Sequence, residues 1–381
     1  MKLVDKIKQY ISSKSKVVDE NENVELLYQS ILKELKEYKE LYFEEAKKLN
    51  GHPHFKTKEV QEKVINLINE DERVLFIRGD WGRTLGFEAA KLKLEDVVLR
   101  ILDNHDASLI QDDNGKNIGI EAMSTKLFKA VLKALDNHEL CCQKSGYWGQ
   151  TLGMFCAIDG YEEGVLKALD DKEASHLRCS LKGKNIGMYA AENGLNKAVL
   201  KALDDYDLST QRDDEGFNIG THSAGNCDEE VLIKALDNEE ASLQQTYYGQ
   251  SNIGMLCAQR GFKYATLKAL DNYQASVQTN RHGLNIGMLA ARSDLEECVL
   301  KALDNKEART QLTYLNKENI SSLISSGSFE SFSCPSSPVG FGTSINVTFL
   351  LTSSCTLVEE SFEYISSRSF KTALAYSTSL S

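Results

Sequence analysis

The chain has 381 residues, 41% of them hydrophobic and 26% charged, which is enough for several domains or for one extended array. Its net charge of -12 excludes a generally basic surface, so we expect neither nucleic acid nor a membrane among its partners. No stretch approaches the length of an apolar membrane span, and Met1–Ser15 lacks the apolar region of a secretory signal. The nine cysteines form no CxxC pair. Together these observations predict a cytoplasmic protein with free thiols.

Residues 23–49 predict a helix with one apolar side and one side rich in Lys and Glu. The apolar side comprises Leu26, Leu27, Ile31, Leu32, Leu35, Tyr38, Leu41 and Tyr42. Because the first unit of a repeat array needs its apolar face covered, we assign residues 1–50 to an N-terminal helical cap. A self-associating coiled coil is the alternative. Residues 51–81 predict a degenerate first repeat, since Val64 precedes Gly82 by the interval that separates Val131 from Gly149.

Residues 82–316 contain seven copies of a repeat of 33–34 residues, which is the strongest signal in the chain. One segment of the repeat reads LKALD or a close variant, at residues 99–103, 132–136, 166–170, 200–204, 233–237, 267–271 and 300–304. About 15 residues upstream, a second segment reads NIGM, TLGM or a variant, beginning at Thr84, Asn117, Thr151, Asn185, Asn218, Asn252 and Asn285. Two segments repeated in phase seven times predict a solenoid of stacked helical units.

Each repeat predicts two helices followed by a loop. The first helix starts at the Asn or Thr, which are residue types that cap helix N-termini with their side-chain oxygen. It continues through a pair of small residues, which allow a neighbouring helix to approach closely. In three repeats a glycine ends it, namely Gly160, Gly194 and Gly261. The second helix carries LKALD, whose apolar residues share one side. The Lys and Asp lie on the other side, where we expect local i,i+3 pairs in a solvated scaffold rather than a cation site.

The order of features in each unit resembles the ankyrin repeat. It runs from a glycine to a capped short helix, an Ala-Ala pair, a second glycine and a second apolar helix. The clearest copy is Gly183–Leu195, followed by Val199–Leu203. The resemblance covers about Gly82 to Leu315 and implies an all-α, ankyrin-type helical repeat solenoid, with another two-helix solenoid as the alternative. The chain departs from the family's pattern, with Ile or Leu for its Pro, Gly for its core Leu and Met for its His. These departures predict that the first helix packs differently in detail.

Positions that vary between repeats are candidates for recognition, and several carry large aromatic side chains, which are common binding anchors. We predict the partner-binding residues to be Trp81, Tyr147, Trp148, Phe155, Tyr189, Phe217, Tyr247 and Tyr248. Packing of these side chains on adjacent loops is the alternative. The resemblance implies an inner face lined by the first-helix positions Glu88, Glu121, Phe155, Tyr189, Leu256 and Leu289.

Residues 317–381 form a Ser-rich tail in which the period stops after a partial repeat beginning at Asn319. Its composition predicts disorder over most of its length. A shifted reading frame within an eighth repeat is a second hypothesis for the abrupt change.

The chain holds no phosphate loop, no G-x-G-x-x-G fingerprint, no H-E-x-x-H motif and no Cys/His group with zinc spacing. We therefore expect no catalytic residue, no cofactor and no metal. The predicted function is a monomeric, non-catalytic scaffold in the cytoplasm whose partner is another protein. The alternative is the targeting module of a secreted bacterial effector, delivered into a host cell, or of an enzyme whose active part lies in a flank.

Overall fold

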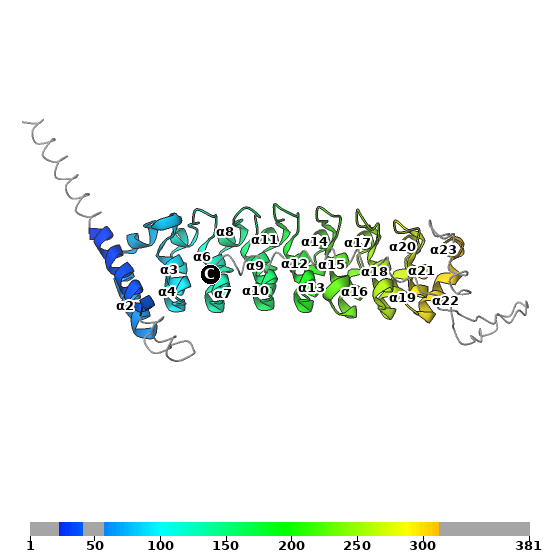
Figure 1. Ribbon diagram of the computed structural model, residues 1–381, viewed down its shortest axis with the longest axis horizontal. Coiled ribbons are helices and arrows are strands. Elements are labelled where there is room, and N and C mark those ends of the chain that lie inside the picture. Colours follow the sequence, from blue (N-terminus) through cyan, green and yellow to red (C-terminus); the bar gives the residue numbers. More distant parts are fainter. Residues whose placement is uncertain (1–22, 41–56, 312–381) are drawn as a thin grey trace, which may run out of the picture.

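The computed structural model describes residues 23–40 and 57–311, which form an elongated row of short helices (Figure 1). Within these residues there is no strand, only an isolated bridge between Ser145 and Gln150. The all-α helical repeat solenoid expected from the sequence is therefore confirmed. The predictions for residues 1–22, 41–56 and 312–381, including the Ser-rich tail, concern segments outside the described residues.

Seven repeats each contribute one helix to a middle layer and one to a lower layer of the row (Figure 1). The first helices are α3 (Leu85–Lys91), α6 (Ile118–Ser124), α9 (Leu152–Ile158), α12 (Ile186–Glu192), α15 (Ile219–Asn226), α18 (Ile253–Arg260) and α21 (Ile286–Arg292). The second helices are α4 (Glu95–Leu102), α7 (Phe128–Ala134), α10 (Glu162–Ala168), α13 (Asn196–Leu203), α16 (Glu229–Ala235), α19 (Lys263–Asp271) and α22 (Glu296–Asp304).

A third short helix follows in every repeat, so the prediction of two helices and a loop was wrong. These helices are α5 (His105–Ser108), α8 (His138–Cys142), α11 (Lys172–His176), α14 (Tyr206–Thr210), α17 (Glu239–Leu243), α20 (Tyr273–Val277) and α23 (Lys306–Thr310). Each begins at an Asn or Asp whose side chain accepts a hydrogen bond from a backbone N–H of the first turn. They form the upper layer in Figure 1.

The N-terminal part consists of the helix at 23–40, α2 (Thr57–Glu70) and the 3-10 turns η1 (Glu72–Phe76) and η2 (Asp80–Gly82). The helix at 23–40 buries Val24, Tyr28, Ile31, Leu35 and Tyr38 in one cluster with residues of α2 and the first repeat. Leu26, predicted to lie on the apolar side, is exposed, because the buried stripe runs through Val24 and Tyr28 instead. The assignment of this helix as a cap stays a prediction.

The first helix is capped by a side chain, as its sequence predicts, in six of the seven repeats. Where the cap is Asn, its side chain also bonds to the Gln that follows the repeat's third helix. Asn185 accepts a hydrogen bond from the Met188 N–H at 2.9 Å, and its amide donates to the Gln211 side chain at 3.0 Å. Gln211 then donates to the backbone of the preceding repeat. The same pairs recur as Asn117–Gln143, Asn218–Gln244, Asn252–Gln278 and Asn285–Gln311. This buried polar ladder runs from repeat to repeat.

Thr replaces the capping Asn in two repeats, and there the Gln is absent as well. Thr84 makes no side-chain cap bond, contrary to the prediction, and Ile110 stands where the Gln would be. The Thr151 hydroxyl accepts a hydrogen bond from the Met154 N–H at 3.5 Å, and Leu177 stands where the Gln of that repeat would be. Because a buried amide without a partner is costly, the two positions change together.

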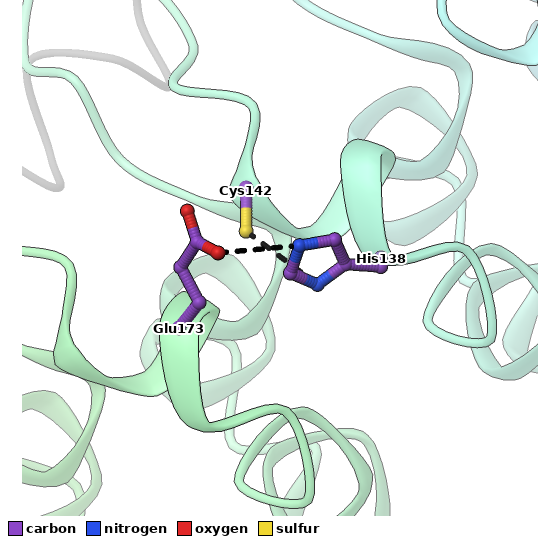
Figure 2. A group of neighbouring side chains, drawn as sticks. All are labelled: His138, Cys142 and Glu173. Carbon is purple, nitrogen blue, oxygen red and sulfur yellow. Dashed lines mark hydrogen bonds and ion pairs between the residues drawn. The ribbon is translucent and has the colours of Figure 1, made fainter.

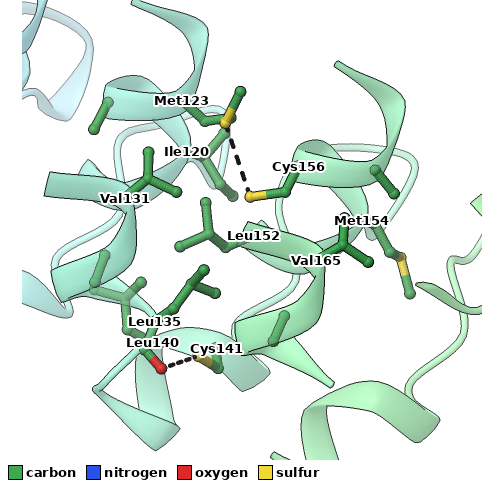
Figure 3. Close-up of a cluster of buried hydrophobic side chains, with 14 of the residues drawn as sticks. Ile120, Met123, Val131, Leu135, Leu140, Cys141, Leu152, Met154, Cys156 and Val165 are labelled. Carbon is green, nitrogen blue, oxygen red and sulfur yellow. Dashed lines mark hydrogen bonds between the residues drawn. The ribbon is translucent and has the colours of Figure 1, made fainter. Parts of the chain in front are cut away.

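The glycine at the second position of the first helix makes room for the next repeat. A Cβ added at Gly187 would lie 2.5 Å from Ile219 Cδ1, and at Gly119 it would lie 2.8 Å from Leu152 Cδ2. Figure 3 shows Leu152 pointing from α9 into the apolar cluster of the preceding repeat. Thus two of the three departures from the ankyrin pattern, Ile or Leu for Pro and Gly for Leu, are one change, since the Ile or Leu of one repeat fills the volume that Gly leaves in its neighbour.

The Lys and Asp of LKALD pair between repeats, so the predicted i,i+3 pairs were wrong. Lys201 Nζ lies 2.6 Å from Asp170 of the preceding repeat and also donates to the Leu166 carbonyl at 2.7 Å. Equivalent ion pairs are Lys133–Asp103, Lys167–Asp136, Lys234–Asp204, Lys268–Asp237 and Lys301–Asp271. Six of the seven Asp residues, all but Asp304 in the last repeat, therefore have a Lys of the next repeat as their cation, which supports the scaffold interpretation over a cation site.

Candidate protein-binding site

The loop tips between the third helix of one repeat and the first helix of the next are tied to one another by backbone hydrogen bonds. The Asp113 N–H donates to the Trp81 carbonyl at 2.9 Å, the Ser180 N–H to the Trp148 carbonyl at 2.7 Å, and the Tyr247 N–H to a carbonyl of the preceding tip at 3.0 Å. Five of the six junctions between neighbouring tips carry such a backbone bond, and at the sixth the Gln111 side chain donates to the Lys144 carbonyl. The tips therefore form one edge with a restrained backbone, here called the loop-tip edge.

Five of the predicted aromatic residues project from the loop-tip edge into solvent. Their exposed fractions are 66% for Trp81, 87% for Tyr147, 41% for Trp148, 58% for Tyr247 and 74% for Tyr248. Five large rings on one edge offer contact area to a partner, and a restrained backbone limits the entropy lost when they bind.

Tyr247 is held more firmly than the other exposed rings. The Arg212 guanidinium lies 4.6 Å from its ring centroid, and the ring also lies close to the backbone of Gly216 in the preceding tip. Arg212 is itself anchored by hydrogen bonds to the carbonyls of Gly216 and Gln245. The ring is therefore oriented before any partner arrives.

The other three predicted residues lie lower, toward the first helices, and are half-buried. Tyr189 donates its hydroxyl proton to the Cys179 sulfur at 3.4 Å and accepts a hydrogen bond from Gln150 at 3.1 Å. Burial, followed by the bond to Cys179, raises the pKa of Tyr189. The structure thus places Tyr189 against adjacent loops, as the alternative interpretation expects. Phe217 lies 5.1 Å, ring to ring, from His222.

The first-helix positions predicted to line the inner face are mostly half-buried, and Leu289 is buried. The sequence analysis missed His222, which occupies the same position in the fifth repeat, four residues after its capping Asn218. His222 lies 3.0 Å from Asp213 and 3.5 Å from Glu192, which is paired with Lys184. These contacts satisfy the His222 ring within the chain.

Asp213 anchors the turn of its loop tip. Its carboxylate accepts hydrogen bonds from the backbone N–H groups of Glu215 and Phe217, at 2.9 and 2.8 Å. Burial alone would raise the pKa of Asp213, but the hydrogen bond from His222, its charge and the two backbone bonds hold the pKa below its ordinary value. The ionised carboxylate is therefore part of the folded loop.

Three exposed tyrosines were not predicted. Tyr206 and Tyr273 begin third helices and are 56% and 58% exposed, and Tyr264 lies on the second helix α19 with 62% exposed. Tyr206 donates to Glu240 of the next repeat at 2.7 Å. The signal for Tyr206 and Tyr273 was the Asn or Asp cap before each, which went unused because the third helices were taken for loops.

No family model matches this chain, and no curated protein matches it. Among solved structures it is similar to the ankyrin repeat domain of Bcl-3, described as a unique member of the IkappaB protein family. The TM-score is 0.45 and the identity 16%, and the match covers 56% of this chain and 97% of the other.

Proposed function

We propose that this protein is a non-catalytic scaffold that binds another protein through its loop-tip edge. The observation that carries the proposal is the row of five exposed aromatic side chains on loops whose backbones are hydrogen-bonded to one another. Aromatic side chains bury a large area with few rotatable bonds, so they dominate many protein interfaces. The repeated polar ladder and ion pairs beneath them supply a rigid support.

The proposed compartment is a reducing one such as the cytoplasm. Its support is that the seven cysteines among the described residues are all free thiols, six of them buried in the apolar core. Among the described residues no helix combines the length and apolarity that a membrane crossing demands.

The test compares two variants that remove exposed aromatic rings from different faces. Trp148→Ala with Tyr247→Ala and Tyr248→Ala strips the loop-tip edge, whereas Tyr264→Ala with Tyr273→Ala strips rings elsewhere. The full chain and both variants are used to capture partners, which are quantified by mass spectrometry. We expect the partner to be lost from the first variant, with each anchor costing about 1–2 kcal/mol or more, and retained by the second.

Thermal unfolding by circular dichroism verifies that both variants keep the fold. Equal capture by the loop-tip variant and the full chain would refute the assignment of the loop-tip edge. Loss of the partner from the Tyr264/Tyr273 variant alone would place binding on the helical faces instead.

A further inference from the structure

A group of metal-ligand side chains forms where the third helices α8 and α11 of adjacent repeats meet. His138 and Cys142 lie one turn apart on α8, and Glu173 reaches toward them from α11 (Figure 2). One ligand atom from each of the three lies within 4.8 Å of those of the other two. Nitrogen, thiol sulfur and carboxylate oxygen are the donors that zinc takes in proteins.

The histidine of this group is oriented as metal-bound histidines are. His138 Nδ1 lies 2.6 Å from the Asp171 carboxylate, which fixes the ring and leaves Nε2 as the free nitrogen. Nε2 lies 3.3 Å from the Glu173 oxygen. Two ligands on one tetrahedral zinc ion, each at about 2.0 Å, are separated by roughly 3.3 Å. The spacing of this pair therefore already suits a shared ion.

The thiol is accessible to an incoming ion. Cys142 is half-buried, and the sulfur lies 4.0 Å from His138 Nδ1, whereas its neighbour Cys141 is fully buried and directed at the Leu135 carbonyl. The side chains of His138 and Glu173 are 57% and 70% exposed, so both can turn toward an ion without disturbing the core.

Other repeats lack one or more members of this set: the α5–α8 junction has His105 and Glu139, 3.9 Å apart, but Leu109 in place of Cys142. In α14 the residues equivalent to His138 and Cys142 are Tyr206 and Thr210, and Tyr206 simply donates to Glu240 of the next repeat. The α8–α11 junction thus keeps the carboxylate of this contact and replaces the two other groups by an imidazole and a thiol.

We propose that His138, Cys142 and Glu173 bind one divalent ion of the zinc class, with Asp171 as the positioning residue. The sulfur–metal bond forms as the Cys142 thiol releases its proton to solvent. Three protein ligands leave the fourth tetrahedral position for water or for a group from outside the chain. The sequence analysis expected no metal because the ligands come from two repeats and no motif spacing connects them.

Cobalt(II) is the probe, because its absorption reports both the sulfur bond and the geometry. The full chain, held reduced without thiol reagents, is titrated with cobalt(II) chloride. We expect a sulfur-to-cobalt charge-transfer band and the visible bands of tetrahedral cobalt, saturating at one ion per chain. Zinc chloride should abolish both.

Variants that borrow residues from equivalent positions keep the fold. Cys142→Thr should remove the charge-transfer band, and Cys141→Ser, the matched control, should leave it unchanged. Asp171→Asn keeps a helix-capping side chain, as Asn238 does, and should weaken cobalt binding about 10- to 100-fold while keeping the band.

A neighbouring group at the next junction, formed by His176, Asp205 and Asp207, offers no sulfur and serves as a further control. His176→Leu should leave the charge-transfer band unchanged. The proposal is overturned if the full chain gives no charge-transfer band, if the band survives Cys142→Thr, or if it disappears with His176→Leu. Partner capture by Cys142→Thr is independent of these spectra, so this inference and the proposed function fail separately.

Discussion

The pairing of the capping Asn with the Gln that follows the third helix predicts a strong energetic coupling between two residues that are 26 positions apart. The perturbation replaces Asn185 by Thr and Gln211 by Leu, singly and together. The chain itself holds the doubly changed pair, as Thr151 with Leu177. Each single change removes the shared hydrogen bond and leaves one amide with only a 3.4 Å bond, from Asn185 to the Leu208 carbonyl or from Gln211 to the His176 carbonyl. The double change removes both amides.

The magnitude follows from the contacts that each change removes. Gln211→Leu takes away the 3.0 Å acceptor of the fully buried Asn185 amide, which should cost about 1–3 kcal/mol. Asn185→Thr removes the donor to the half-buried Gln211, and it replaces a 2.9 Å cap by one like the 3.5 Å cap of Thr151, so we expect about 1–2 kcal/mol. The double variant should be less destabilised than the sum by about 1–2 kcal/mol.

Urea unfolding followed by circular dichroism measures the four free energies of unfolding in the same full chain. Because repeat arrays can depart from two-state unfolding, the four curves must first show a common slope. Effects that add to within about 0.3–0.5 kcal/mol would refute the coupling and reduce the ladder to independent caps.

Two further predictions concern single residues. Gly187→Ala should lower the free energy of unfolding by about 1–3 kcal/mol through overpacking against Ile219, although alanine normally favours a helix. Its control is the exposed Gly225→Ala, where a Cβ meets nothing closer than 4.0 Å; a loss of stability equal to that of Gly187→Ala would contradict the packing argument. Asp213→Asn should destabilise the chain at pH 7, and the difference from the unchanged chain should shrink as the pH falls below about 4. The pKa of Asp213 is lower in the folded chain, so its contribution is complete above the unfolded value of 3.8 and is lost as the pH falls through the folded value. Urea midpoints measured against pH test this, and a difference that grows in acid would show the opposite linkage.

Local sequence signals predicted the first two helices of each repeat well. Asn at the start, glycine at the end of helices such as α18, and the apolar side of LKALD each act within a few residues. The third helices were missed because four or five residues are too few to show a period. They are stabilised by their N-terminal caps and by the Gln that follows them. Gln211, for example, accepts a hydrogen bond from Asn185 and donates one to the backbone of the preceding repeat.

Aromatic residues at the loop tips could be named from the sequence, but not how they lie. Tyr147 and Tyr189 look alike as variable aromatics, yet one is 87% exposed and the other is hydrogen-bonded to two adjacent loops. The difference comes from the stacking of repeats, which decides which rings are covered.

The sequence by itself determined the unit, through its capping residues, its apolar pattern and its period of 33–34 residues. Only the tertiary structure decided what the units do to one another. It set Ile219 into the space at Gly187, joined Lys201 to Asp170, and brought Glu173 to His138. The physical reason is that these contacts join residues about 30–35 positions apart, and such residues meet only after one repeat has packed on the next.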